Sequence, residues 1–146
     1  MKQHSTGFTL VEILVAVAIF GVIISLGLLM SMETLRGTTF RSERDTMVAV
    51  LQKARSRAMA NINQSPWGVH YQMSDHTYTI FRGSAFAAGA PTNEVVQGNK
   101  DASTTPSLYN VVFTQLSGTT NPLSVIVEEN SRNTTLSVNY EGTIIW

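Results

Sequence analysis

The sequence predicts an α+β protein in which one long amino-terminal helix packs on a small antiparallel β-sheet domain. Three features support this prediction. They are an apolar segment at residues 8–32, helical spacing of apolar residues with no proline before Pro66, and alternation of apolar and polar residues from Trp67 onward. The chain of 146 residues is long enough for one domain beyond the apolar segment.

Residues 8–32 can span a membrane, because a bilayer core of about 30 Å needs about 20 apolar residues in a helix. The whole chain is 43% hydrophobic and 14% charged, whereas soluble domains are about 25% charged. This imbalance is concentrated in the segment and argues against an ordinary cytosolic enzyme. Cleavage of a secretory signal after Ala18 is disfavoured, because apolar residues continue beyond it and a carboxylate, Glu12, lies before it.

Glu12 is the only charged side chain in residues 8–32. A charge at the centre of a membrane helix costs about 2.5–3.5 kcal/mol, and less near its end. One explanation is a position at headgroup level near the helix start, where the helix dipole stabilises a carboxylate. The other is a cationic partner in the same apolar layer.

The amino-terminal residues KQHSTGFTLVE, residues 2–12, resemble the signature of type IV pilins and type II secretion pseudopilins. The resemblance implies a leader of residues 1–7, cleavage by a prepilin peptidase between Gly7 and Phe8, and methylation of the new Phe8 amine. An α-amine has a pKa of about 7.7–8.0. The resemblance further implies that this amine meets Glu12 of a neighbouring subunit, so that Phe8 and Glu12 set the axial register of assembly.

The same resemblance implies the pilin fold and a structural role in a type IV pilus or type II secretion pseudopilus. The expected partners are other pilin or pseudopilin subunits, the prepilin peptidase and the assembly platform in the membrane. We expect a single-pass inner-membrane precursor with its carboxyl-terminal domain outside the cytoplasm, and later a filament. No enzymatic activity, cofactor or small-molecule substrate is expected.

Several alternatives stay open from the sequence. A monomeric, signal-anchored extracytoplasmic binding protein could use residues 8–32 merely as a tether. Major and minor subunits, and pilus, secretion and DNA-uptake filaments, are not distinguished. The cations Arg36, Arg41 and Arg44 follow the apolar segment, whereas the leader carries Lys2, so a count of cations mildly favours the opposite orientation.

Residues 33–62 are expected to continue the helix as an amphipathic segment, giving one helix from about residue 8 to residue 60. Apolar residues recur at spacings of 4, 3, 4 and 4: Met47, Leu51, Ala54, Ala58 and Ile62. Three glycines are weak points, and a leucine stands where many pilins carry a helix-loosening proline: Gly21, Gly27, Gly37 and Leu29.

Lys53, Arg55 and Arg57 form a small basic group near the expected end of the helix. Such a group is what a DNA-binding minor pilin would use. No aromatic stacking platform is interleaved with these cations. A solvated or subunit-facing surface is therefore the favoured interpretation, and nucleic-acid binding is not expected.

Residues 63–146 are expected to form a sheet of four to six antiparallel strands packed on the helix stripe. Alternation predicts a hairpin from residues 67–73 and 77–82, then a long loop at 83–106, strands at 108–116 and 123–129, and a second hairpin with its turn at Glu141-Gly142. The segments ARSRA and NYEGTI resemble the H-type minor pseudopilins.

No catalytic or metal site is predicted. Two histidines with Asp75 could hold a metal, but His70 is expected on an exposed strand face and His76 in a turn. Glu128 and Glu129 are expected on opposite faces of a strand, which disfavours a paired acid and base. The chain has no cysteine. Trp67 and Trp146 are expected in the core or at a subunit contact, and the glycosylation patterns at Asn63 and Asn133 carry no prediction.

Overall fold

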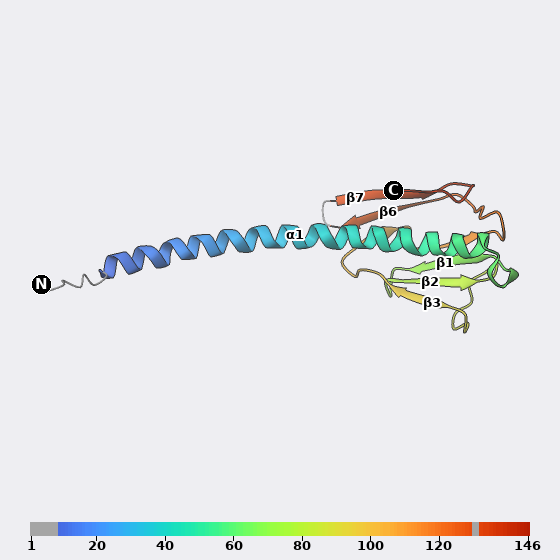
Figure 1. Cartoon of the computed structure of the whole chain (residues 1–146), viewed down its shortest axis with the longest axis horizontal. Helices are drawn as coiled ribbons and strands as arrows, with labels where there is room; N and C mark the ends of the chain where they lie inside the picture. Colours follow the sequence, from blue (N-terminus) through green and yellow to red (C-terminus); the bar gives the residue numbers. More distant parts are fainter. Residues whose placement is uncertain (1–8, 130–131) are drawn as a thin grey trace, which may run out of the picture. The chain divides into compact units, whose positions relative to one another are not determined.

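The computed structural model describes residues 9–129 and 132–146, with the side chains of residues 28–39 excepted. Helix α1 spans Leu10–Met59, and a short 3₁₀ turn spans Ile62–Gln64. Eight strands follow (Figure 1): β1 Trp67–Gln72, β2 Thr77–Arg82, β3 Glu94–Gln97, β4 Ser103–Thr105, β5 Leu108–Phe113, β6 Leu123–Glu129, β7 Arg132–Val138 and β8 Ile144–Ile145. The chain divides into two compact units, Met1–Gly37 and Thr38–Trp146, and each is described by itself.

Helix α1 confirms the long helix predicted from the sequence, and all three of its glycines lie inside it. The predicted stripe is correct for Met47, Leu51, Ala54 and Ala58, which are buried. It is wrong for Ile62, which is 42% exposed. The helix ends earlier because Asn61 adopts a left-handed conformation, with φ of 55°.

The end of α1 is capped from a distant part of the chain. The last carbonyl groups of a helix have no partners within the helix. Here the N–H of Leu116 donates a hydrogen bond of 3.0 Å to the carbonyl of Ala58. The loop between β5 and β6 therefore closes the helix end that lies beside it.

The strands form two antiparallel sheets of four strands, in the orders β3-β2-β1-β5 and β4-β6-β7-β8. The prediction of one sheet with four to six strands is therefore wrong. Both predicted hairpins are present: β1 pairs with β2 from Trp67–Arg82 to Gln72–Thr77, and β7 pairs with β8 across the turn at residues 139–143. The predicted strand at 108–116 ends at Phe113, where the loop that caps α1 begins.

The segment 83–106, predicted to be a long loop, contains two strands, β3 and β4. The loop prediction is therefore wrong for Glu94–Gln97 and Ser103–Thr105. Strand β3 pairs with β2, and β4 pairs with β6. Both are short and lie at the edges of their sheets. Edge strands need only one partner and only one buried face, so their sequences carry little alternation.

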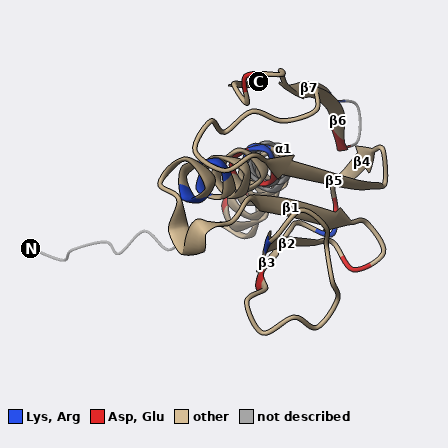
Figure 2. Ribbon diagram, turned by 90° about the vertical axis from the view of Figure 1, so that its right-hand side faces the viewer, with Lys and Arg blue, Asp and Glu red and all other residues tan. Residues whose placement is uncertain are grey.

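One hydrophobic core joins α1 to both sheets in the second unit. The buried helix stripe packs with Val69, Tyr71 and Ile80 of the first sheet and with Val127 and Leu136 of the second. Figure 2 shows strands β1 and β2 on one side of α1 and strands β6 and β7 on the other. Trp67 is 5% exposed and confirms the predicted core position, whereas Trp146 is 55% exposed.

The outer face of the first sheet is covered as well, and the expected exposure of His70 is wrong. Its side chain is 8% exposed and its ring stacks on Phe86, with ring centroids 3.8 Å apart. Phe86 also meets Phe81 edge to face, and His70 Nδ1 lies 2.8 Å from Asn110 Oδ1. Alternation assigned His70 to the correct face, but it could not show that Phe86 covers that face.

Candidate functional site

The first turn of α1 presents the predicted assembly residue Glu12. Gly7 and Phe8, the predicted processing residues, lie outside the described residues. The helix begins at Leu10 because Thr9 caps it: the N–H of Glu12 donates to Thr9 Oγ1 at 3.3 Å and to the Thr9 carbonyl at 3.1 Å. Thr9 is thus the N-cap, and Glu12 occupies the third helical position, where glutamate is common after a threonine cap.

Thr9 is a residue that the sequence reasoning missed, although a signal was present. Threonine followed three residues later by glutamate, ahead of an apolar run, is a recognised helix-start pattern. Glu12 lies in the first turn of the helix. There the unpaired N–H groups and the helix dipole stabilise its negative charge.

The helix that begins with this turn has an apolar surface. The window Leu10–Gly27 has a mean hydropathy of 2.6, and none of its residues is buried. By length and composition this part of α1 can cross a membrane. Ser25 does not interrupt it, because its hydroxyl donates to the Gly21 carbonyl at 2.8 Å within the same helix. In a soluble environment such a surface is too apolar to stay uncovered.

The predicted basic group is divided between two sides of α1, and its interpretation as a solvated surface is only partly correct. Lys53 and Arg57 both pair with the carboxylate of Glu94 on β3; the distance from Arg57 is 2.8 Å. The Arg57 guanidinium also lies over the Trp67 ring, 4.9 Å from its centre. On the other side, Arg55 donates to the Glu141 carbonyl at 3.0 Å. Each cation therefore has a partner within the domain.

Glu94 is the second residue that the sequence reasoning missed. Hydrogen bonds from Lys53 and then Arg57 hold the pKa of the Glu94 carboxyl below its usual value. A lowered pKa means that this pairing stabilises the fold above the ordinary glutamate pKa of about 4.3 and is lost as the pH falls. Because Glu94 is about one-third exposed, solvent weakens the effect.

A buried carboxylate, Glu43, joins α1 to the first sheet. It is 2% exposed and accepts hydrogen bonds of 2.6 Å from the Tyr78 hydroxyl and from the N–H of Asn99. Burial, with the neighbouring Tyr109 and Glu43, raises the pKa of Tyr78 far above its usual value, so Tyr78 stays a donor. Glu43 was also missed, although it precedes Met47 by four residues and extends the buried stripe.

The two histidines that were considered as metal ligands, His70 and His76, do not form a metal site with Asp75 in the described part of the chain. His76 lies in the turn between β1 and β2 with φ of 48°, and Asp75 accepts a hydrogen bond from Ser74. Within the described ranges, no group of three or more histidine, aspartate or glutamate side chains is arranged to hold a metal ion. Glu128 is exposed and Glu129 is buried, which confirms their opposite orientations on β6.

Two glycines allow the turn at residues 139–143, the loop between β5 and β6 and the end of α1 to pack closely together. Gly142 has φ of 74°, and a Cβ atom there would lie 2.1 Å from the Gly118 carbonyl oxygen and 2.9 Å from Arg55 Nε. Gly118 has φ of 66°, and a Cβ atom there would lie 2.7 Å from Met59. Both positions combine a left-handed backbone with close packing, so only glycine fits.

We expect Gly142→Ala to destabilise the domain by about 2 kcal/mol or more, because the methyl group adds a clash to the backbone strain. Thermal unfolding of the full chain in detergent micelles measures the effect. Gly89→Ala is the matched control, since Gly89 has the same φ of 74° but no atom within 4 Å; its expected cost is about 1 kcal/mol. Equal losses in the two variants would show that the close approach at Gly142 contributes nothing.

Comparison with known proteins gives one match to the amino-terminal sequence and one match to the fold. Residues 2–30 match the prokaryotic N-terminal methylation motif. No curated protein matches the sequence. The structure is similar to the crystal structure of the type IV minor pilin FimU of Pseudomonas aeruginosa PAO1, with a TM-score of 0.58 and 19% sequence identity over 72% of this chain and 90% of that chain.

The structural likeness confirms the predicted α+β fold, because the similarity covers most of both chains. The motif match covers the segment that contains the expected leader and the start of the apolar helix. The chain thus carries a prokaryotic N-terminal methylation motif, and its fold is similar to that of a type IV minor pilin.

Proposed function

We propose that the chain is a structural subunit of a type IV pilus or type II secretion pseudopilus. The observation that carries the proposal is the methylation motif at residues 2–30, which contains the apolar helical window Leu10–Gly27, and no residue of this window is buried. An apolar helical surface of this length needs lipid or other helices around it. A subunit that moves from the membrane into a filament meets both conditions in turn.

Processing is the first step of the proposed function. The precursor is anchored in the inner membrane, and prepilin peptidase cuts between Gly7 and Phe8 and methylates the Phe8 amine. The motif that covers residues 2–30 supports this step. The cap at Thr9 agrees with this step, because the described helix begins at Leu10, after the proposed cut.

Assembly is the second step. The amine of one subunit pairs with Glu12 of its neighbour within the apolar layer. In such a layer the attraction between the two charges offsets their desolvation only when both are well placed. The pair therefore sets the register of the helices, whose apolar side chains supply the contact area, while the second unit stays outside the cytoplasm.

The partners of this subunit are other pilin or pseudopilin subunits, prepilin peptidase and the assembly platform. The interactions of Lys53, Arg55 and Arg57 with the domain itself favour a structural role over DNA binding. We do not propose a catalytic activity for the chain. The competing proposal is that the chain is a monomeric binding protein tethered to the membrane by its apolar helix. The two functions differ in the mature amino terminus.

Mass spectrometry of the mature amino terminus tests the proposal. We expect a chain that begins at methylated Phe8 and is recovered in sheared filaments of the producing cells. The matched control is Gly7→Val, because a branched side chain before the cut should block processing and leave the leader in place. A chain that begins at Met1 or at Ile19, or a mature chain absent from filaments, would contradict the proposed function.

A further inference from the structure

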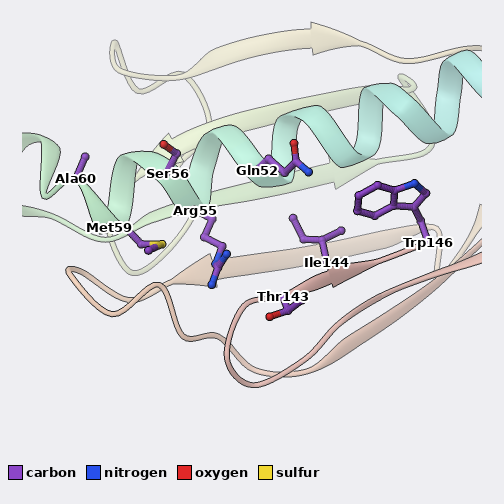
Figure 3. Close-up of a pocket in the computed structure, with 8 residues that line it drawn as sticks. All are labelled: Gln52, Arg55, Ser56, Met59, Ala60, Thr143, Ile144 and Trp146. Carbon is purple, nitrogen blue, oxygen red and sulfur yellow. The ribbon is translucent and has the colours of Figure 1, made fainter.

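An open groove of about 680 Å³ lies between the carboxyl-terminal end of α1 and strand β8. Figure 3 shows its two walls, with Ile144 and Trp146 pointing toward the helix and Arg55 pointing from the helix toward the turn before β8. All of these residues lie in the second unit. Neither the methylation motif nor the proposed assembly pair uses this surface.

The helix wall of the groove is the face of α1 that the core leaves uncovered. Gln52, Ser56 and Met59 are exposed, whereas Leu51, Ala54 and Ala58 on the other face are buried. The run from Gln52 to Met59 covers about 10 Å of helix, at 1.5 Å per residue. About three residues of an extended chain cover the same distance.

The strand wall of the groove is an open sheet edge. β8 is the last strand in the order β4-β6-β7-β8, and it pairs with β7 through Ser137–Ile145 and Val138–Ile144. The other side of β8 has no strand beside it among the described residues. An edge of this kind offers backbone N–H and C=O groups to an incoming strand.

The ends of the groove are apolar and exposed. Met59 is 46% exposed and Trp146 is 55% exposed. Exposed tryptophan and methionine side chains are enriched at protein interfaces. A segment lying in the groove would therefore bury apolar side chains at both ends.

Arg55 gives the groove a positive charge, and it is the charged residue among those that line it. One of its terminal nitrogens donates to the Glu141 carbonyl. Its Nε is buried and has no hydrogen-bond partner within the described part of the chain, so an occupant of the groove can meet only the terminal nitrogens. The two terminal nitrogens of a guanidinium carry four N–H donors, and such a group is complementary to a carboxylate. The occupant of the groove should therefore carry an acidic side chain.

The wall formed by the turn is held in place without the occupant. Asn139 and Thr143 exchange hydrogen bonds, and the N–H of Gly142 donates to the Asn139 carbonyl at 2.9 Å. The turn therefore presents β8 in a fixed position beside α1. Such preorganisation lowers the entropic cost of binding.

We propose that this groove binds a short extended segment of a neighbouring filament subunit, which adds a strand to β8, places apolar side chains against Met59 and Trp146 and pairs a carboxylate with Arg55. Strand addition to a sheet edge is a general mode of peptide recognition. The proposal rests on the proposed function, because it takes its partner from the filament.

The chain has no cysteine, so a single introduced thiol reports on the groove. Ser56→Cys places the thiol in the groove, and Ser124→Cys, on the exposed face of β6, is the matched control. The rate of maleimide labelling is measured for the full chain in membranes, before assembly, and again in sheared filaments. We expect assembly to slow the labelling of Ser56→Cys about tenfold or more and to leave that of Ser124→Cys unchanged.

A photoactivated cross-linker on the Ser56→Cys thiol then identifies the occupant by peptide mass mapping. The expected adduct lies on an extended segment of a filament subunit that contains an aspartate or glutamate. Unchanged labelling in filaments, equal protection at both positions, or an adduct on a helix or on a protein outside the filament would overturn the proposal.

Arg55→Gln tests the charge. It should restore part of the labelling of Ser56→Cys in filaments, whereas Lys53→Gln, which removes a charge beside Glu94 on the other side of α1, should not. Equal effects of the two variants would contradict a specific role for Arg55. If the chain is recovered in filaments and its groove thiol still reacts, the proposed binding to the groove is refuted but the proposed function stands. If the chain is absent from filaments, both proposals are refuted.

Discussion

Replacing Glu12 by alanine should abolish filament assembly while the precursor is still cut between Gly7 and Phe8. The variant should insert in the membrane at least as well as the natural chain, because a charge within a membrane helix costs up to about 2.5–3.5 kcal/mol. What it loses is the counter-charge for the Phe8 amine of a neighbouring subunit. A desolvated amine without its partner costs several kcal/mol, and about 3 kcal/mol already lowers an association constant more than about a hundredfold.

The measurement compares the amount of chain in sheared filaments with the amount in membranes, and reads the amino terminus in both. Val11→Ala is the matched control, because it truncates the neighbouring exposed side chain without touching the charge; it should assemble. Glu12→Asp keeps the charge and should retain part of the assembly. Filaments of the Glu12→Ala chain at the natural level would exclude the register role of Glu12, and an uncut precursor would place its role in processing instead.

The long helix and the two hairpins could be predicted from the sequence because their signals are local. Apolar spacing and the absence of proline before Pro66 identify α1. The two turns that reverse the chain, at residues 73–76 and 139–143, interrupt clear alternation. The helix end at Met59 could not be predicted, because it depends on the left-handed Asn61 and on a hydrogen bond from Leu116.

The second sheet could not be predicted because its composition depends on contacts between distant residues. Strand β4 has three polar residues, Ser103–Thr105, and becomes a strand only by pairing with β6. Burial of His70 depends in the same way on Phe86, which lies in a loop without periodicity. Periodicity assigns a residue to a face, but it does not show what covers that face.

The candidate site also contains residues that could be predicted from the sequence and residues that could not. Glu12 could be found from the sequence, because a lone carboxylate in an apolar segment is conspicuous. The partner of Lys53 and Arg57 could not be found, because Glu94 lies on a short edge strand far along the chain. The groove beside β8 likewise depends on how the turn at residues 139–143 packs on α1.

Replacing Glu43 by alanine should destabilise the domain by about 2–4 kcal/mol. The change leaves the buried Tyr78 hydroxyl and the N–H of Asn99 without their acceptor. A buried donor that loses its partner costs about 1–3 kcal/mol, and hydrogen bonds to charged groups are the stronger ones. For a domain of this size the expected fall in Tm is on the order of 10–20 °C. Tyrosine near-UV circular dichroism during thermal unfolding of the full chain in micelles measures it.

Two further variants separate the hydrogen bonds of Glu43 from its packing. Glu128→Ala removes an exposed glutamate and should change the stability by less than about 0.5 kcal/mol. Tyr78→Phe removes one donor, so its combination with Glu43→Gln in a double-mutant cycle isolates the pair, with an expected coupling of about 0.5–3 kcal/mol. If Glu43→Ala were as stable as Glu128→Ala, the carboxylate would be dispensable for docking α1 on the first sheet. A destabilised Glu43→Ala without coupling to Tyr78 would assign the effect to the cavity that the shorter side chain leaves.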